Sequence, residues 1–322
     1  MDVKRASISV VIPVYRSEAN LRPLLERLTP ALCALTDTHE ILLVDDSSPD
    51  GSWGVVEELG ASDDRIIGIQ LMRNYGQHNA LLCGIRAARY ELVVTMDDDL
   101  QHPPEEIAKL LECLTPDRDV VYGTPKNETH GFWRDLASRM TKLALQSAMG
   151  AETARKVSAF RAFRTSLRGA FADYRSPHVS IDILLTWATT RFASIEVKHD
   201  VRRVGKSNYT FSKLLTHALN MVTGFSTLPL QFASWIGFAF TIFGFVILVY
   251  VIGRYALYGS SVSGFPFLAS VIALFSGAQL FALGIIGEYL ARIHFRMMER
   301  PAYAVRSRLA SPSEPDGPSN QR

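Results

Sequence analysis

The chain has 322 residues, of which 48% are hydrophobic, and its formal net charge is +2. This length allows one sizeable domain plus a further segment, and the near-neutral charge argues against a nucleic-acid partner. Cys33, Cys83 and Cys113 are odd in number and lack the spacing of a metal site or a disulfide framework, so three reduced thiols in a reducing compartment are expected.

No secretory signal is expected from the N-terminal residues. Its run Ile8–Pro13 is too short and too rich in β-branched residues for the apolar core of such a signal. We therefore expect the bulk of the chain to remain in the cytoplasm.

Strand-like and helix-like segments alternate along the N-terminal part. Short apolar runs indicate buried strands, and apolar residues recurring every three or four positions indicate helices. The expected strands are Ile8–Val14, Glu40–Val44, Ile66–Leu71 and Leu92–Met96, and the helices between them are Ala19–Leu35, Ser52–Leu59 and Asn79–Arg89. This βαβα order predicts a mostly parallel sheet covered by helices, whose ligands bind beyond the carboxyl ends of the strands.

Further elements are expected after the fourth strand. Pro103 and Pro104 precede two acidic residues, which is typical of a helix start, and this helix should run to about Leu114. The remaining expectations are strands at Asp119–Tyr122 and Val157–Phe163, amphipathic stretches at Phe132–Met149 and Thr210–Leu228, a helix at Ser180–Thr190 and a disordered end at Ser311–Arg322.

Two long apolar segments indicate a membrane hairpin. No Asp, Glu, Lys or Arg occurs from Leu214 to Ile252, and the part from Pro229 can cross a bilayer core of roughly 30 Å. A second candidate is Phe265–Ile286. Basic residues flank the pair on both outer sides, which places both termini in the cytoplasm. The alternative is a pair of buried helices in a soluble protein.

Two acidic clusters follow predicted strands: Asp45 and Asp46 after the second, and Asp97–Asp99 after the fourth. Carboxylates on such a turn can hold Mg²⁺ or Mn²⁺, and a metal bridging a diphosphate neutralises the charge that develops when the diphosphate leaves. Alternatively, acidic residues before a Pro-started helix only cap it or lie in solvent. With the membrane segments, the acidic cluster suggests chemistry between a soluble phosphorylated substrate and a lipid.

Five short blocks of sequence follow one another in a recognisable order: Ile12–Tyr15, Val44–Asp50, Arg73–His78, Asp97–Pro104 and Arg202–Tyr209. The first four resemble the blocks of family-two glycosyltransferases, which have the GT-A fold. The fifth, together with two membrane spans and Gly287-Glu288-Tyr289, is similar to the branch that uses polyprenyl phosphates. That branch includes dolichyl-phosphate mannose synthases and the undecaprenyl-phosphate glucosyl- and formamidoarabinose transferases. The resemblance extends to about Arg306.

The resemblance implies a site for a nucleoside diphosphate sugar. Pro13 and Tyr15 would line the nucleotide pocket, and the carboxylates of Asp45 and Asp46 would accept hydrogen bonds from the base or ribose. The metal and diphosphate would be held by Asp97, Asp99 and Gln101, where Gln101 can alternatively be a helix-entry residue.

Two neighbouring features belong to the implied donor site. Arg73 opens a loop of basic, aromatic and amide groups that would form a wall of the pocket, although a surface turn containing Gly76 has a similar composition. Asp98 stands where relatives have a small residue, so its carboxylate either points away from the metal or assists in donor binding.

The implied acceptor site consists of basic and hydroxyl side chains, namely Lys126, Arg134, Ser138, Arg202, Ser207 and Tyr209. Guanidinium groups suit bidentate contacts to phosphate. The competing explanation is a generic basic face drawn to anionic lipid headgroups.

The chain departs from the family pattern at two places. Relatives commonly show Tyr-Asn-Glu in the first block, whereas Glu18 lies one place late here. Some members carry an Asp assigned as a base in a later block, but Val157–Arg161 contains no carboxylate. We expect the acceptor phosphate to act as its own nucleophile, with no essential acidic residue outside the donor and metal sites.

Two other classes of protein share part of this pattern. A processive polysaccharide synthase would share the first four blocks, but it usually has Gln-x-x-Arg-Trp and more spans, and the nearest match, Gln231–Trp235, lacks the Arg. A non-catalytic membrane scaffold would be expected to lose the acidic ligands, which are all present.

The sequence therefore predicts an inverting, metal-dependent transfer of one sugar to a polyprenyl phosphate, most simply undecaprenyl phosphate, at the cytoplasmic face of the inner membrane. The sugar stays open, and relatives suggest a homo-oligomer. The expected parts are a cytoplasmic GT-A domain at 1–210, an amphipathic juxtamembrane helix at 211–228, two transmembrane helices within 229–291 and a cytoplasmic tail at 292–322, disordered at its end.

Overall fold

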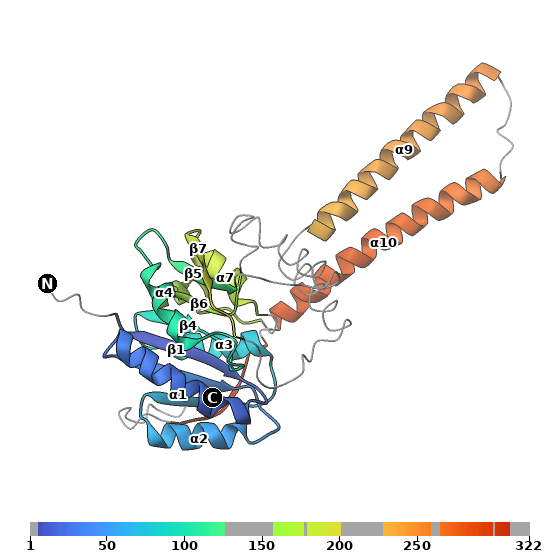
Figure 1. Cartoon of the computed structure of the whole chain (residues 1–322). Helices are drawn as coiled ribbons and strands as arrows, with labels where there is room; N and C mark the ends of the chain where they lie inside the picture. Colours follow the sequence, from blue (N-terminus) through green and yellow to red (C-terminus); the bar gives the residue numbers. More distant parts are fainter. Residues whose placement is uncertain are drawn as a thin grey trace. The chain divides into compact units, whose positions relative to one another are not determined.

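The computed structural model describes residues 6–125, 157–176, 179–200, 228–258, 265–298 and 300–309. The chain divides into two compact units (Figure 1). One comprises residues Met1–Phe211 and Glu299–Arg322, and the other comprises Ser212–Met298. The first unit is therefore interrupted by the second, and the chain returns to it near the C-terminus.

The first unit contains an eight-stranded sheet in the order β7-β5-β6-β4-β1-β2-β3-β8. The pairs of β1 with β2 and β4, of β2 with β3, and of β5 with β7 are parallel. Two strands run antiparallel to their neighbours, β6 and β8. The mostly parallel sheet is thus confirmed, with strands β1 (Ile8–Val14), β2 (His39–Asp45), β3 (Ile66–Leu71), β4 (Leu92–Thr95), β5 (Val120–Pro125), β6 (Arg161–Arg164), β7 (Phe192–Val197) and β8 (Val305–Arg308).

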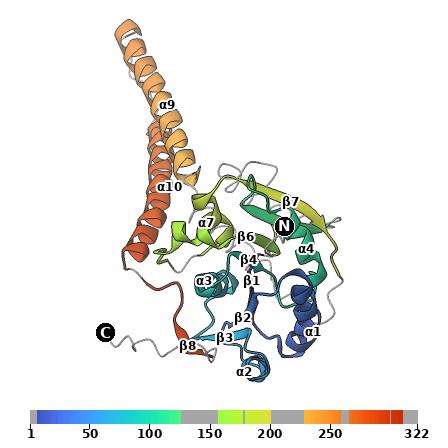
Figure 2. The ribbon, with the colours of Figure 1, turned by 90° about the vertical axis from the view of Figure 1, so that its left-hand side faces the viewer.

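Helices cover both faces of the sheet (Figure 2). One core lies under α1 (Glu18–Leu35), α2 (Ser52–Ser62), the 3-10 turn η1 (Pro104–Glu106) and α4 (Ile107–Glu112). The other lies under α3 (Gln77–Ala87), the 3-10 turn η2 (Thr165–Phe171) and α7 (Ile181–Ala188). The central strand β1 is buried along its whole length, because adjacent residues point into opposite cores.

The expected strands and helices of the first 114 residues occur in the expected order, with β1 and β3 at the expected bounds. The strand expected at Val157–Phe163 begins later, at Arg161. The sequence did not indicate β7 or β8, because β7 is only partly buried and β8 consists of Val-Arg-Ser-Arg. Phe132–Met149, Ser311–Arg322 and all of Thr210–Leu228 except Leu228 lie outside the described residues.

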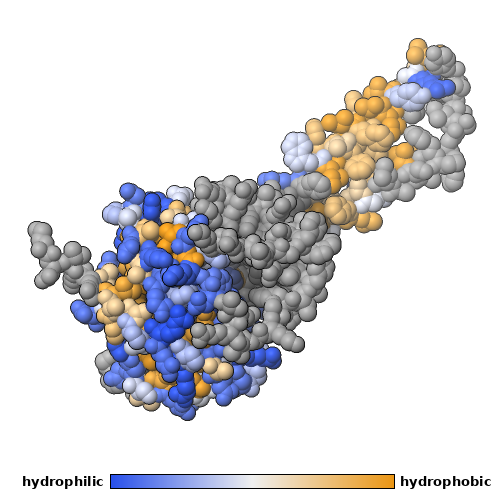
Figure 3. Space-filling model, viewed as in Figure 1, coloured by the Kyte–Doolittle hydropathy of each residue, from blue (hydrophilic) through white to orange (hydrophobic). Residues whose placement is uncertain are grey.

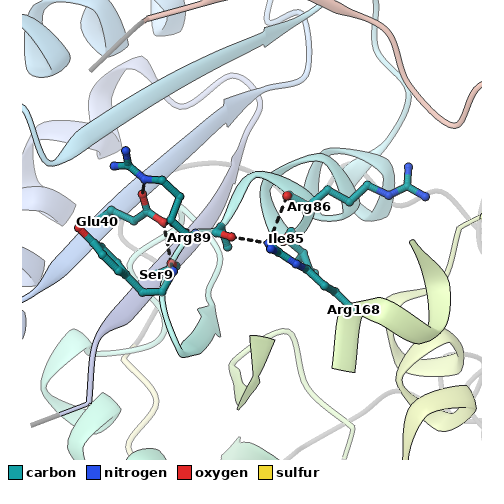
Figure 4. Close-up of polar contacts among 8 residues, drawn as sticks. Ser9, Glu40, Ile85, Arg86, Arg89 and Arg168 are labelled. Atoms are coloured by element: carbon teal, nitrogen blue, oxygen red, sulfur yellow. Dashed lines mark hydrogen bonds and ion pairs between the residues drawn. The ribbon is translucent and has the colours of Figure 1, made fainter. Parts of the chain in front are cut away.

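Polar contacts hold the C-terminal end of α3 (Figure 4). The Arg168 guanidinium donates to the carbonyls of Ile85 at 3.3 Å and Arg86 at 3.2 Å, and also to that of Ala88. These carbonyls have no partner within the helix, so a cation there is favourable. Arg86 in turn donates to three carbonyls that follow η2 or end it, those of Phe171, Ala172 and Tyr174.

A buried carboxylate ties the same end of α3 to the sheet. Glu40 of β2 is fully buried and accepts hydrogen bonds from Ser9 Oγ and Arg89 Nε, both at 2.7 Å (Figure 4). Arg89 follows α3, so the C-terminal end of α3 is held both by Arg168 and, through Arg89, by Glu40. The opposite end of α3 begins at Gln77, shortly after the carboxyl end of β3. The start of α3 therefore lies at the carboxyl edge of the sheet.

The second unit contains two long helices, α9 (Leu228–Tyr258) and α10 (Phe265–Met297). The Phe275 ring of α10 packs against Phe240 and Phe243 of α9, with centroids 5.6 and 6.5 Å apart. In α9, Ala233–Arg254 is a stretch of 22 residues that is long and apolar enough to cross a membrane, and α10 contains a shorter one, Phe275–Ala291. Both helices present apolar side chains on their outer surface (Figure 3).

Candidate active site

The turns after β1, β2 and β4 lie next to one another at the carboxyl edge of the sheet. Each contains a residue other than glycine in the left-handed region: Arg16 has φ 57°, Ser47 has φ 55° and Leu100 has φ 62°. Such residues are uncommon, and strained backbone concentrates at functional sites. The three turns contain or adjoin the donor and metal residues that the sequence predicts.

Asp98 links the turn after β4 to the turn after β1. Its carboxylate accepts hydrogen bonds from the backbone N–H of Tyr15 at 3.3 Å and from the Ser17 hydroxyl. Burial raises the pKa of Asp98 to about 6, although both hydrogen bonds oppose this. The Asp98 carboxylate is therefore directed at the β1 turn, where the Tyr15 side chain is 41% exposed.

The two aspartates at the end of β2 are buried and bound to backbone groups. Asp45 accepts from the N–H of Ser48 at 3.2 Å and from the Gln70 amide at 3.4 Å. Asp46 accepts from the N–H groups of Tyr75 and Gly76, both at 2.7 Å. Burial raises the pKa of Asp46, and these two hydrogen bonds oppose the rise. Both carboxylates thus shape the surrounding loops, and their contact with a base or ribose stays a prediction.

The Arg73–His78 loop connects β3 with α3 at the same edge. The Arg73 guanidinium lies over the Tyr75 ring, 4.7 Å from its centroid. Gly76 has φ 95°, a conformation that L side chains rarely adopt, and α3 begins at the next residue. The side-chain amide of Gln77 donates to Asp97 Oδ1 at 2.5 Å. This contact was missed by sequence reasoning, where Gln77 was only one member of the block.

The predicted metal residues occupy a single turn after β4. Asp97 and Asp99 are partly buried, and Asp99 accepts a hydrogen bond from the N–H of Gln101 at 3.1 Å. The carbonyl of Gln101 accepts from the N–H of Asp200 at 2.8 Å. The chain after β7 therefore lies beside this turn, a proximity that the sequence did not indicate.

Two histidines adjoin the turn. The His102 ring stacks between Phe160 and His199, with both centroid distances 5.1 Å. Burial lowers the pKa of His102 to about 4, so the ring is neutral at physiological pH. His102 belongs to the fourth block, which was the available signal in the sequence, whereas nothing singled out His199.

The donor set of the turn suits a divalent cation that binds together with a diphosphate. Asp97 and Asp99 offer the carboxylate oxygens that Mg²⁺ and Mn²⁺ take. Among the described residues, no group of three or more His, Cys, Asp and Glu could hold a metal by itself. Since Mg²⁺ is commonly held by one or two carboxylates plus substrate phosphates, the residues present fit such a cation.

A buried ionic network joins the end of β4 to Arg161, the last residue of the Val157–Arg161 segment that contains no carboxylate. Arg161 of β6 is 1% exposed and forms an ion pair with Asp182 of α7. Arg161 also donates to Thr95 Oγ1 at 3.1 Å, and the Tyr122 hydroxyl donates to Asp182 at 3.0 Å. These contacts join β4, β5, β6 and α7 in the core.

Glu18, which the sequence left without a clear part in donor binding, accepts a hydrogen bond from the N–H of Gly51 at 3.0 Å. It thereby holds the turn before α2. Pro13 lies within β1. The six predicted acceptor residues, Lys126, Arg134, Ser138, Arg202, Ser207 and Tyr209, lie outside the described residues.

Comparison with known proteins places this site in a family. Residues 9–174 match the model of glycosyl transferase family 2. A Proteus mirabilis protein named undecaprenyl-phosphate 4-deoxy-4-formamido-L-arabinose transferase is 35% identical over 301 residues, which cover 92% of each chain. A protein of the same name from Aeromonas hydrophila is 33% identical over 311 residues, covering 96% of this chain and 95% of the relative.

Solved structures share the fold. Glucosyl-3-phosphoglycerate synthase from Mycobacterium tuberculosis, in complex with Mn²⁺, UDP and phosphoglyceric acid, aligns with a TM-score of 0.52 and 18% identity over 68% of this chain and 76% of that one. Mannosyl-3-phosphoglycerate synthase from Rubrobacter xylanophilus aligns with a TM-score of 0.50 and 17% identity over 67% and 72% of the two chains. The chain therefore belongs to glycosyl transferase family 2: it is a glycosyltransferase with the GT-A fold, similar along nearly its whole length to undecaprenyl-phosphate transferases.

Proposed function

We propose that this enzyme transfers a single sugar from a nucleoside diphosphate sugar, expected to be a UDP-sugar, to undecaprenyl phosphate at the cytoplasmic membrane face. One observation carries the proposal: Asp46, Asp97 and Asp98 accept hydrogen bonds that join the turns after β2 and β4 to the Arg73–His78 loop and to the turn after β1. This arrangement supports a nucleotide pocket and a diphosphate site at one edge of the sheet. The names of the full-length relatives support the lipid acceptor.

The acceptor supplies its own nucleophile in the proposed reaction. The second pKa of a phosphate monoester is about 6, so the lipid phosphate is largely ionised at neutral pH. One of its oxygens attacks the anomeric carbon as the bond to the diphosphate breaks, and this single displacement inverts the configuration. No protein base is required, consistent with the absence of a carboxylate from Val157–Arg161.

The chain's own residues would position the reactants. Asp97, Asp99 and Gln101 would hold a divalent cation and the diphosphate, and the cation would neutralise the charge on the leaving group. Tyr15, Asp45 and Asp46 would shape the nucleoside pocket. The acceptor phosphate would be bound by the basic and hydroxyl side chains at Lys126, Arg134, Ser138, Arg202, Ser207 and Tyr209.

The connectivity supports a membrane hairpin with both ends on one side. The chain leaves the first unit after Phe211 and re-enters it at Glu299, and β8 pairs with β3 of the same sheet. A folded domain cannot lie on both sides of a bilayer, which supports an even number of crossings by α9 and α10. The basic flanks place that side in the cytoplasm.

Radiolabelled nucleotide sugars tested with undecaprenyl phosphate and the full-length protein in membranes would decide the activity. UDP-4-deoxy-4-formamido-L-arabinose is the first donor to test, because of the relatives' name. We expect one sugar per lipid, loss of product with EDTA and recovery with Mg²⁺ or Mn²⁺. Asp99→Ala should lower turnover by about 100-fold, as expected when a group that stabilises developing charge is removed. Turnover that is unaffected by EDTA, or no turnover of any sugar, would contradict the proposal. A polymeric product would indicate a processive synthase.

A further inference from the structure

The amide of Gln77 contacts the first aspartate of the predicted metal turn. Gln77 Nε2 lies 2.5 Å from Asp97 Oδ1. Only the amide nitrogen can donate to a carboxylate, so the orientation of the Gln77 amide follows from its partner. A donor at Oδ1 restricts the rotation of the Asp97 carboxylate, which leaves Oδ2 in a defined direction.

The backbone on both sides of this amide is held in place. Asp46, at the end of β2, accepts from the N–H groups of Tyr75 and Gly76 directly before Gln77. Gln77 itself is the first residue of α3, whose far end is held by Arg168 and, through Arg89, by Glu40. His78 accepts a hydrogen bond from the N–H of Ile181 at 3.4 Å, which adds a contact to the start of α7.

We propose that Gln77 is a positioning residue for Asp97, which couples the anchored Arg73–His78 loop to the metal turn. This inference rests on the proposed metal-dependent function and deepens it. Metal-ligating carboxylates are commonly oriented by a hydrogen bond from a neighbouring group, and loss of that group typically costs about 10- to 100-fold in metal affinity or activity. Gln77 supplies such a bond from the start of α3, whereas Asp97 lies in the turn after β4.

The test is Mn²⁺ binding to purified full-length protein in detergent with UDP present, measured from the paramagnetic resonance signal of free Mn²⁺. Gln77→Ala removes the donor, and Gln77→Glu places a second carboxylate against Asp97. We expect Mn²⁺ affinity to fall about 10-fold or more for Gln77→Ala and further for Gln77→Glu. UDP affinity measured in EDTA should stay at the wild-type value for Gln77→Ala.

Asn74→Asp is the matched control, since it adds the same charge to an exposed position of the same loop and no described hydrogen bond joins it to Asp97. It should weaken Mn²⁺ binding less than Gln77→Glu does. Mn²⁺ affinity at the wild-type level in both Gln77 variants would overturn the inference. Loss of UDP affinity in EDTA equal to the loss of Mn²⁺ affinity would also overturn it, because Gln77 would then contact the nucleotide directly.

The same measurement separates the inference from the proposed function. Asp97→Ala and Asp99→Ala should both abolish the UDP-dependent binding of Mn²⁺. If these two variants bind Mn²⁺ like the wild type, the metal-dependent function fails. If they lose Mn²⁺ while both Gln77 variants retain it, only the positioning role of Gln77 fails.

Discussion

The aspartates at the strand ends differ in what they contact. Asp46 binds the backbone of the loop before α3, Asp97 accepts from the Gln77 amide, and Asp98 binds the backbone and hydroxyl of the turn after β1. Three chemically identical side chains thus hold two segments: Asp46 and Asp97 hold the Arg73–His78 loop, and Asp98 holds the turn after β1. We infer that the shape of the donor pocket depends on all of them, whichever of them touches the substrate.

Replacement of Asp98 tests this difference at the level of one residue. Asp98→Ala removes the acceptor of two hydrogen bonds at the β1 turn, each worth about 1 kcal/mol, so UDP affinity should fall roughly 10-fold. Asp98→Asn keeps an acceptor oxygen and should therefore lose less UDP affinity than Asp98→Ala. Isothermal titration of both variants with UDP checks the order. Equal affinities for the wild type and Asp98→Ala would show that this bridge is unimportant for the pocket.

The cysteines should differ in reactivity because they differ in burial. Cys33 is exposed, whereas Cys83 is 4% exposed and its pKa is raised to about 12 by burial. At pH 8 the Cys83 thiol is almost wholly protonated, and the thiolate is the reactive form. Iodoacetamide followed by mass spectrometry of the peptides should modify Cys33 in the folded protein and Cys83 only in denaturant. Early modification of Cys83 would contradict its place in the core.

At the scale of the elements, buried carboxylates join segments that hydrophobic contact alone would leave less well oriented. Asp119 precedes β5 and is 4% exposed. It accepts hydrogen bonds from Thr189 Oγ1 at 2.6 Å and from Arg191 Nε at 2.8 Å, both between α7 and β7, and lies 3.6 Å from Arg164 Nε of β6. One side chain therefore fixes β5, β6 and the approach to β7 at one edge of the sheet.

Asp119→Asn should destabilise the catalytic domain in a pH-dependent way. Burial alone would raise the pKa of Asp119, but the hydrogen bonds from Thr189 and Arg191 and the charges of Arg191 and Arg164 outweigh it and lower the pKa. A lowered folded-state pKa gives stability that is present above the unfolded value of about 3.9 and is lost as the pH falls through the folded value. The free energy of unfolding of Asp119→Asn should be about 2 kcal/mol lower than that of the wild type at pH 7. This difference should shrink below about pH 4.

Thermal unfolding at several pH values, followed by circular dichroism of the full-length protein, measures this effect. Asp117→Asn is the control, because Asp117 is exposed and lies two residues away. It should change stability little at any pH. A loss in Asp119→Asn that is the same at pH 7 and at low pH would show that packing rather than charge is responsible.

At the scale of the whole molecule, the chain returns to the catalytic sheet after the apolar helices. Leu309 donates its N–H to the carbonyl of Gly68 at 2.9 Å, and its side chain packs against the core beneath α1 and α2. A Cβ at Gly68 would meet the Leu309 side chain at 2.6 Å and the Val56 side chain at 2.7 Å, so a larger residue there would force these side chains to shift. Tyr303 packs against the opposite core. Residues 302–309 therefore belong to the catalytic domain and cover the edge of β3 that would otherwise be unpaired.

Removal of this contact should weaken the edge of the sheet at β3, which lies more than two hundred residues before Leu309 in the chain. Leu309→Ala should lower the free energy of unfolding of the catalytic domain by about 1.5 kcal/mol, since the side chain is half-buried. Val305→Ala removes an exposed side chain from β8 and serves as the control. Limited proteolysis of both variants and the wild type, with cleavage sites mapped in β3, gives the measurement. Equal protection of all three would show that the tail is dispensable for the domain.

The sequence by itself determined the alternation of β1 to β4 with their helices, because buried strands and amphipathic helices differ in hydrophobic period. It also placed Asp45, Asp46 and Asp97–Asp99 at strand ends, where parallel strands put ligands. Only the tertiary structure decided which segment each carboxylate contacts and that Gln77, at the start of α3, meets Asp97 in the turn after β4. It likewise decided that Val305–Arg308 completes the sheet, since pairing across hundreds of residues depends on backbone hydrogen bonds that leave no periodic pattern in a short polar strand.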